Sequence, residues 1–487
     1  MGQVLGHLEP KIVWDIFEEI TKIPRPSKKE EKIAAWVIKF AKDNGLEYNT
    51  DKLGNIVVRK PATAGMENRK GIVIQGHIDM VCEKNSDVEH DFDTDPLKLL
   101  IDGDWVRAQG TTLGADNGIG VAMGLAVLQS KDIPHPNMEV LCTLDEETGL
   151  TGAIQLGTDL LKHADILINL DSEEDGAFTI GCAGGANTGA TFAYAEDSVP
   201  AGHVAYEVTV KGLQGGHSGI EIHDGRANAI KLLNRALWNL TKKFDLRLSY
   251  FKAGSAHNAI PREAFAVITI AKDHEAKFLE KIAKIQEVLK SEWITKEPNI
   301  QFLAAAKDLP AKVMTKCMQN RLLSSLYAVA HGVARFSPDI AGLVQTSTNL
   351  AIIETRELEV FVLTSQRSSI ESEKNDMANT VRAAFELGGA VVRQGDGYPG
   401  WQPNVNSPIL NIAKEISAKQ YGKEPKIEAI HAGLECGLIG EKYPGMDMIS
   451  FGPNLKDVHS PDERLQISTV GNCWKLLCEI LKNIPVK

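Results

Sequence analysis

Short apolar runs alternate with stretches of helical periodicity along residues 1–171. The apolar runs are GIVIQGH (71–77), MEVLCTLDEE (138–147) and ADILINLD (164–171). Each is short enough for a buried strand, and the stretch NGIGVAMGLAVLQS (117–130) has the length and spacing of a helix. Strands that alternate with helices predict an α/β fold, with a mostly parallel central sheet flanked by helices.

Two further helices are predicted from signals at their N-termini. Ser27 and Glu30 have the spacing of a capping box at the start of the first. Ser460, Pro461 and Glu463 predict that the last helix of the chain begins within HSPDERL. His459, just before this signal, is expected at an exposed loop tip.

The pattern changes after the third apolar run. A glycine-rich stretch, GCAGGAN (181–187), is suited to a hinge, and HVAYEVTVKG (203–212) then alternates with period two, as a strand with one exposed face does. The α/β pattern resumes near the C-terminus. We therefore expect one domain formed by residues 1–186 and 395–487, with an inserted α+β domain at 187–394.

The composition is that of an ordinary soluble globular protein, because 43% of the 487 residues are apolar and 24% are charged. The net charge of −11 argues against a nucleic-acid partner, which requires a basic surface. No apolar run approaches the roughly 20 residues that span a membrane, and the N-terminus lacks a signal-peptide core. The seven cysteines form no C-x-x-C pair, which favours reduced thiols. We therefore expect a cytoplasmic protein without a membrane partner.

Polar side chains gather at the ends of the predicted strands and in nearby turns. The segments that carry them are GHID, GADNG, DEETG, NLDSEE and VHSPDE. They supply His77, Asp79, Asp116, Asp145, Glu146, Glu147, Asp171 and His459. Because ligand-binding residues collect at the carboxyl ends of parallel strands, these side chains are expected to converge. Carboxylates packed so densely repel one another unless cations lie between them.

The mixture of histidine and carboxylate favours zinc, manganese or cobalt, since calcium takes oxygen ligands only. Two ions that share a carboxylate form a recurring hydrolytic centre. Asp116 suits the shared position because it lies in an Asp-Asn-Gly turn before a helix and offers two oxygens.

Each of these residues taken alone has a more ordinary explanation. His77 resembles a core or loop histidine, Asp116 a helix cap, and the pair Glu146–Glu147 two solvated acids. His459 alone would be a surface residue. Their occurrence together at one predicted edge is what favours a metal site.

A set of longer motifs identifies a family. The chain contains, in order, GHIDMV, TTLGADNGIG, DEETG, LINLDSEE, GCAGG, KGLQGGHSG, HAGLECG and GPNLKDVHSPDE. These closely resemble the bacterial aminoacyl-histidine dipeptidases, which are co-catalytic zinc peptidases related to carnosinase and aminoacylase. The resemblance covers essentially the whole chain. It implies an enzyme that hydrolyses dipeptides with broad specificity, including Xaa-His dipeptides and, as a further candidate, β-Ala-His.

The resemblance also implies a role for each polar residue at the predicted edge. It implies two divalent ions per chain, zinc in the first place, with manganese or cobalt as alternatives. The implied ligands are His77 and Asp171 for one ion, Glu147 and His459 for the other, and Asp116 bridging both. Asp79 would orient His77, as outer carboxylates commonly do for a metal-binding imidazole. Glu146 would be the general base and later the acid, activating a water that bridges the ions.

The inserted segment resembles the lid, or dimerisation, domain of these peptidases, which implies a homodimer formed through it. The implied substrate-binding residues are His217, Asn258 and Arg367 in the inserted segment, together with His431 and Gly433 in a loop of the catalytic domain near the substrate carboxylate. His217 would stabilise the oxyanion, and the fork of Arg367 would bind the free carboxylate of a dipeptide. Without the resemblance, Arg367 is more simply a solvated side chain.

Three other functions stay open at this point. The chain could be an aminoacylase-type amide hydrolase, since related sites cleave other amides. It could be a non-catalytic binding protein on a peptidase scaffold, although such a protein is expected to have lost a ligand or the base. A nucleotide-dependent dehydrogenase is disfavoured, because GIGVAMG has the wrong glycine spacing for a dinucleotide fingerprint.

Overall fold

A computed structural model describes residues 3–395 and 397–487, and the chain divides into two compact units. Unit 1 comprises the chain up to Cys182 together with Trp401–Ala429 and Leu434–Lys487. Unit 2 comprises Ala183–Gly400 and Ile430–Gly433. The sequence-based borders lie within a few residues of the first two transitions, but no sequence signal predicts the short segment 430–433.

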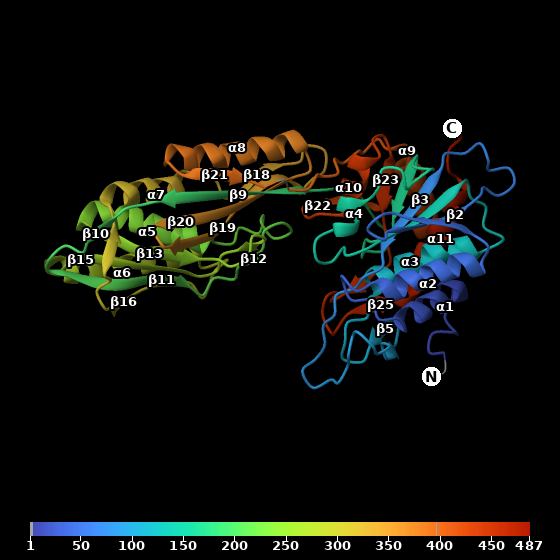
Figure 1. The fold of residues 1–487 in the computed structure, drawn as a ribbon, viewed down its shortest axis with the longest axis horizontal. Helices are drawn as coiled ribbons and strands as arrows, with labels where there is room; N and C mark the ends of the chain where they lie inside the picture. The colour runs from blue at the N-terminus through green and yellow to red at the C-terminus, as the bar shows by residue number, and fades with distance from the viewer. Residues whose placement is uncertain (1–2, 396) are drawn as a thin grey trace. The chain divides into compact units, whose positions relative to one another are not determined.

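A mixed sheet forms the centre of unit 1 (Figure 1). Its strands, in spatial order, are β1 (Glu47–Thr50), β2 (Ile56–Lys60), β6 (Met138–Thr143), β3 (Ile72–His77), β7 (Ile166–Asn169), β23 (Asp447–Ser450), β8 (Ala177–Cys182) and β22 (Lys426–Ile430). The central strands β6, β3, β7 and β23 run parallel, whereas β1, β2 and β8 pair antiparallel. The predicted α/β fold is confirmed, with parallel pairing confined to the middle of the sheet.

Helices cover this sheet and bury its strands. They are α1 (Lys11–Thr21), α2 (Glu31–Asp43), α3 (Ala115–Gln129), α4 (Thr151–Gln155), α9 (Pro408–Tyr421), α10 (Glu435–Lys442) and α11 (Ile467–Lys482). Every residue of β3 and of β6 is buried. Burial on both faces explains why these strands are apolar runs and do not alternate with polar residues.

A small antiparallel sheet also belongs to unit 1. Its strands, in spatial order, are β24 (Leu455–Lys456), β25 (Arg464–Gln466), β5 (Trp105–Ala108) and β4 (Leu99–Asp102). The turn between β24 and β25 carries His459. The prediction of a helix starting within HSPDERL is therefore wrong, because β25 occupies its place and α11 begins only at Ile467.

The predicted capping box before α2 is also wrong. The helix begins at Glu31, and the Ser27 hydroxyl donates to a carboxylate oxygen of Asp79, 2.8 Å away. Glu30 accepts a hydrogen bond from the N–H of Asp145 at 3.0 Å. Both side chains thus bind the loops that follow strands of the sheet.

Unit 2 is built on an antiparallel sheet. Its strands, in spatial order, are β16 (Gln301–Lys307), β11 (His203–Lys211), β15 (Ala264–Ala271), β13 (Arg247–Ala253), β19 (Val344–Arg356), β20 (Glu359–Ser368), β9 (Gly184–Ala193) and β21 (Val391–Gln394), with β18 (Gly332–Phe336) beside β19. Short strand pairs are β10 (Glu196–Ser198) with β17 (Lys312–Met314), and β12 (Gly216–His217) with β14 (Ala259–Ile260).

The helices of unit 2 pack against this sheet and form an apolar core with it (Figure 1). They are α5 (Ala229–Phe244), α6 (Glu275–Trp293), α7 (Lys316–Ala328) and α8 (Glu371–Leu387), with a short 3₁₀ turn η1 (Lys272–His274) before α6. Asn228 caps α5 through its side chain, which accepts from the N–H groups of Ile230 and Lys231. This is the α+β organisation expected for the inserted segment.

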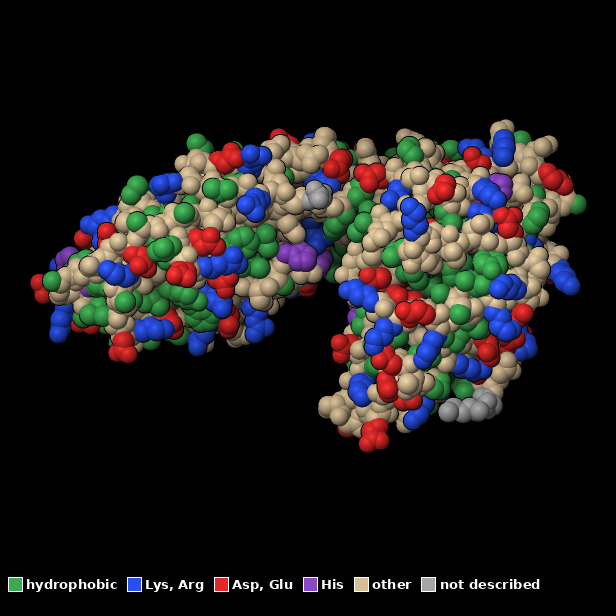
Figure 2. Space-filling model, viewed as in Figure 1, with side chains coloured by type: hydrophobic (Ala, Val, Ile, Leu, Met, Phe, Trp, Pro, Cys, Tyr) green, Lys and Arg blue, Asp and Glu red, His purple; other side chains and the backbone are tan. Residues whose placement is uncertain are grey.

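The surface charges and the cysteines show what the composition predicts for a globular protein. Acidic and basic side chains are interspersed on the face of each unit that Figure 2 shows. All seven cysteines are free thiols. Within the described part of the chain, no helix has both the length and the apolar character needed to cross a membrane.

Candidate metal centre and active site

Strand ends in unit 1 place the predicted residues together. His77 is the last residue of β3, and Asp79 follows it. Glu146 and Glu147 follow β6, and Asp171 follows β7. Because β3, β6 and β7 are parallel neighbours, these loops emerge at the same edge of the sheet.

Asp116 reaches the same place from the start of α3. Its backbone and that of Asn117 are not helical (ψ 110° and 31°), so the chain turns here before the regular helix. The Asn117 side chain donates to the carbonyl of Leu170 at 2.6 Å, next to Asp171. The beginning of α3 is thereby attached to the loop after β7.

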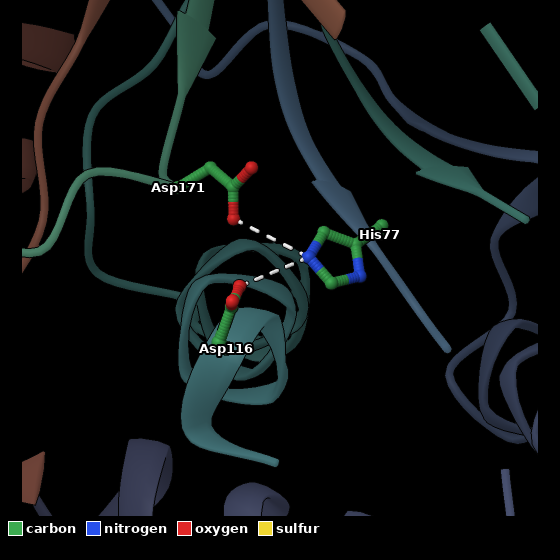
Figure 3. Close-up of side chains that lie close together, drawn as sticks. All are labelled: His77, Asp116 and Asp171. Atoms are coloured by element: carbon green, nitrogen blue, oxygen red, sulfur yellow. Dashed lines mark hydrogen bonds and ion pairs between the residues drawn. The ribbon is translucent and has the colours of Figure 1, made fainter. Parts of the chain in front are cut away.

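The first cluster of side chains is centred on His77 (Figure 3). Its Nε2 lies 3.0 Å from Oδ1 of Asp116 and 3.5 Å from Oδ1 of Asp171. The second cluster is centred on His459, whose Nε2 lies 3.2 Å from Oδ2 of Asp116 and 2.9 Å from Oε2 of Glu147. Asp116 therefore turns one carboxylate oxygen toward each histidine.

His459 is positioned by the turn between β24 and β25. Its backbone is left-handed (φ 61°), and its side chain is 50% exposed. The Ser460 hydroxyl donates to the carbonyl of Asp457 at 2.6 Å and closes the turn. The expectation of a loop-tip histidine is confirmed.

Asp79 holds both His77 and the loop after β6. Its Oδ1 lies 3.2 Å from Nδ1 of His77, and its carboxylate accepts from the N–H groups of Glu146 (3.1 Å) and Glu147 (3.2 Å). Burial alone would raise the pKa of Asp79, but the contact with His77 and the hydrogen bond from Ser27 lower it to about 2. Asp79 is thus ionised, and it holds His77 and the loop after β6 in place.

The remaining charges of the cluster are unfavourable without cations. Burial and neighbouring acids raise the pKa of Asp171 to about 6 and that of Glu146 well above its ordinary range. Hydrogen bonds to Asp116 and Glu147 raise the pKa of His459 to about 11. Each of these shifts has the same cause, which is the crowding of several carboxylates in a buried place.

These side chains have the composition and spacing of metal ligands. His77, Asp116 and Asp171 each offer one atom within 4.8 Å of the others, and so do Asp116, Glu147 and His459. Oε1 of Glu147 and Oδ1 of Asp171 are buried and make no hydrogen bond within the described residues. Two groups of mixed nitrogen and oxygen donors that share Asp116 fit a pair of divalent ions.

Asp145, which belongs to the same acidic segment, lies apart from these groups. Its backbone is left-handed (φ 47°), and its carboxylate accepts hydrogen bonds from the hydroxyls of Thr148 and Thr151. It shapes the turn that presents Glu146 and Glu147.

Comparison with known proteins identifies the family. The model of peptidase family M20/M25/M40 matches residues 73–483. The chain belongs to this peptidase family. Its members are metal-dependent, in agreement with the donor groups of unit 1.

Two relatives are similar over almost the whole chain. Cytosol non-specific dipeptidase of Escherichia coli (strain K12) is 45% identical over 485 residues, 99% of each chain. The crystal structure of aminoacylhistidine dipeptidase from Vibrio alginolyticus is also 45% identical, covers 99% of this chain and 98% of its own, and has a TM-score of 0.93. A more distant structure, aminopeptidase PepT from Bacillus cereus, shares the fold at 16% identity and a TM-score of 0.57, with 98% of this chain and 99% of that chain covered.

The other predicted residues of this M20 peptidase lie in unit 2. His217 and Asn258 line one open cavity of about 620 Å³. Nδ1 of His217 accepts from the N–H groups of Gly219 (3.1 Å) and Ile220 (3.2 Å). A neutral His217 therefore carries its proton on Nε2, where it can act as a donor.

Arg367, His431 and Gly433 form a second group in unit 2. Nη1 of Arg367 donates to the hydroxyl of Tyr398 at 3.0 Å. A Cβ atom on Gly433 would lie 2.9 Å from the same tyrosine ring, so only glycine fits without displacing it. Nε2 of His431 lies 2.7 Å from the hydroxyl of Ser347. The functional roles of these residues stay predictions.

His431 leads to a prediction about stability and pH. Burial, reinforced by the charge of Arg367, lowers its pKa to about 3. An unfolded chain has a histidine pKa near 6.5, so below that pH it binds a proton that folded His431 does not. The contribution of His431 to the free energy of unfolding is therefore complete above pH 6.5 and is lost as the pH falls toward 3. Between pH 7 and 5 we expect a loss of about 2 kcal/mol from this residue.

Urea unfolding of the wild type and of His431→Gln at both pH values measures this loss. The variant should lose about 2 kcal/mol less than the wild type. Equal losses in the two proteins would show that His431 is not held neutral by its surroundings.

Sequence reasoning missed three buried residues next to the site: Arg25, Glu435 and Glu463. Glu435 accepts hydrogen bonds from Gln75 (2.5 Å) and Thr143 (2.7 Å), and burial raises its pKa to about 7. Its place in HAGLECG, an acid among small and apolar residues, was the available signal. Glu463 had only the signal of a helix start, and Arg25 had none, because the partners of both are backbone groups of distant segments.

Proposed function

We propose that the protein is a metal-dependent dipeptidase of broad specificity whose substrates include Xaa-His dipeptides. The observation that carries this proposal is the pair of donor groups that share Asp116, since two ions joined by a carboxylate form a recurring hydrolytic centre. The names of the two similar relatives support a dipeptide as the substrate. β-Ala-His is a further candidate substrate.

We assign the ligands as the family resemblance implies. His77 and Asp171 would hold one ion, Glu147 and His459 the other, and Asp116 both. Zinc is the first choice for this donor set, with manganese and cobalt as alternatives. When bound, the ions would lower the pKa of a water molecule and polarise the scissile carbonyl.

Glu146 is assigned as the general base and acid. Glu147 contacts His459 at 2.9 Å. Glu146 lies with His77 and Glu147 in a third group of possible donors, but among the described residues it is not in either group that shares Asp116. Glu146 would take a proton from the attacking water and give it to the departing amine as the C–N bond breaks. Asp79 would keep His77 and the backbone of both glutamates in place.

Residues of unit 2 are assigned to the substrate. His217 would donate from Nε2 to the developing oxyanion, and Arg367 would bind the free carboxylate with its fork. Asn258, His431 and Gly433 would complete the contacts. We further propose that unit 2 is the lid through which two chains form a homodimer, and that the protein is cytoplasmic, as the name of the Escherichia coli relative suggests for that protein.

The decisive assay follows the release of free amino acids from Ala-His, β-Ala-His and acetyl-His. The protein is stripped with a chelator and then reloaded with zinc, manganese or cobalt. We expect no cleavage by the stripped protein and cleavage of Ala-His after reloading, because the ligands alone supply no Lewis acid. Cleavage of acetyl-His alone would move the assignment to the aminoacylases, and no cleavage in any metal form would favour a binding protein.

A further inference from the structure

Arg25 is a buried cation beside the metal centre, although it is not one of the ligands. The residue is 1% exposed and belongs to the loop that connects α1 to α2. Nη1 donates to the carbonyls of Ile78 (3.1 Å) and Asp79 (2.7 Å), and Nη2 donates to the carbonyl of Gly114. One guanidinium therefore joins the segment after His77 to the segment before Asp116.

Glu463 is a buried acid that binds the same segment as Arg25, but it binds backbone N–H groups where Arg25 binds carbonyls. Its side chain is 2% exposed. Oε2 accepts from the N–H groups of Leu113 (2.7 Å) and Gly114 (2.9 Å), and Oε1 accepts from that of Ala115 (2.8 Å). The N–H of Glu463 itself donates to the carbonyl of Ser460 at 3.0 Å, within the turn that carries His459. Glu463 therefore joins the His459 turn to the segment before Asp116.

Glycines leave the space that Arg25 occupies. A Cβ atom on Gly114 would collide with Nη2 of Arg25, and one on Gly118 would lie 2.8 Å from the same atom. Gly114 also has a left-handed backbone (φ 64°). The glycines of TTLGADNGIG thus admit a charged side chain to the start of α3.

The result is that Gly114 is held at its N–H by Glu463 and at its C=O by Arg25. Two residues further along, Asp116 faces both histidines. Neither side chain is easily removed, because the buried backbone groups that it binds would be left without hydrogen-bond partners. Within the described residues, the hydrogen bonds of both side chains go to backbone groups, so they can fix where the ligands lie without competing for metal.

We propose that Arg25 and Glu463 are positioning residues of the dinuclear centre. Arg25 sets the spacing of His77 and Asp116 for one ion, and Glu463 sets the spacing of His459 and Asp116 for the other. This inference rests on the proposed function, since it assumes that two ions bind to the assigned ligands.

Conservative variants test it. Arg25→Lys keeps the charge but loses the fork that reaches separate carbonyls. Glu463→Gln keeps the shape but replaces one acceptor oxygen by a donor that faces backbone N–H groups. Each variant should weaken the binding of one ion by about 10- to 100-fold, the range found for residues that hydrogen-bond to metal ligands.

Single-site backgrounds separate the two effects. Glu147→Gln removes a ligand of the His459 ion, so that the His77 ion can be titrated alone, and Asp171→Asn does the reverse. Cobalt is titrated by calorimetry and by its visible absorption. Arg25→Lys should weaken binding in the Glu147→Gln background at least tenfold more than in Asp171→Asn, and Glu463→Gln should show the opposite preference.

A matched pair of buried charges serves as the control. Arg59 and Glu139 are bonded to each other at 2.6 Å, and Glu139 accepts from the N–H groups of Lys162 and His163. Glu139 lies near the start of β6, whereas the ligands follow the ends of the strands. Arg59→Lys and Glu139→Gln should leave cobalt affinity within about threefold, although they lower the melting temperature as buried substitutions do.

The outcomes distinguish this inference from the proposed function. If the wild type binds two ions and cleaves Ala-His, but Arg25→Lys and Glu463→Gln weaken both ions equally or not at all, the inference is overturned and the function stands. If the wild type binds no pair of ions, both fail. Because the two variants are judged separately, a failure of Arg25→Lys to fold leaves Glu463→Gln able to overturn the assignment.

Discussion

Glu146→Gln should hydrolyse dipeptides about 10²- to 10⁴-fold more slowly than the wild type while two metal ions stay bound. Glutamine has nearly the same size, so the loop after β6 keeps its shape, and the N–H of residue 146 can still donate to Asp79. What is lost is the carboxylate that we propose takes the proton from water and returns it to the amine. The side chains of Asp116, Glu147 and His459, which we propose as ligands, are unchanged.

The measurement combines initial rates on Ala-His with metal content after gel filtration. Glu174→Gln, which alters an exposed glutamate paired with Lys426, is the control and should keep the wild-type rate. A variant that retained more than a tenth of the activity would rule out Glu146 as the base. A variant that lost metal together with activity would instead mark Glu146 as a ligand.

Asp116→Asn should bind one ion in place of two and lose at least about 10³-fold in activity, which corresponds to roughly 4 kcal/mol of transition-state stabilisation. The carboxylate of Asp116 presents Oδ1 to His77 at 3.0 Å and Oδ2 to His459 at 3.2 Å. An amide has only one acceptor oxygen, and its NH₂ group would face the other ion. The substitution therefore removes a charge and a ligand at once.

Elemental analysis of the zinc-loaded protein gives the number of ions, and the Ala-His assay gives the activity. Asp102→Asn is the matched control. Asp102 is 70% exposed, and its ion pair with Arg107 is long at 3.5 Å, so its loss should have little effect. Two bound ions in Asp116→Asn would show that this residue is not the bridge. Wild-type activity with one ion would show that the second ion is not needed for hydrolysis.

The local sequence was sufficient for the elements that carry the site. The apolar runs of β3, β6 and β7 reflect burial on both faces of a sheet, and the long apolar run of α3 reflects a helix buried on all sides. Because parallel strands end at one edge, the residues that follow β3, β6 and β7 could be placed together before any coordinates were known.

The family could be inferred from the order of the motifs, whereas the site distances and the strand pairing required the tertiary structure. The motifs indicated the peptidase family, and the comparisons confirmed it. The distances from Asp116 to both histidines came only from the tertiary structure, because the turn after β24 returns to α3 from more than 300 residues along the chain. The antiparallel edges of the central sheet have no local signature either, since pairing depends on which strand lies alongside.

The errors share one physical reason. Ser27, Glu30 and Glu463 carry ordinary helix-start signals, but the buried groups of other loops compete for the same oxygens. An exposed helix end can bond to water, whereas a buried N–H without a partner costs about 1–3 kcal/mol, so the distant groups prevail. The sequence by itself determined which residues gather at the edge of the sheet, and only the tertiary structure decided which side chains hold that edge together.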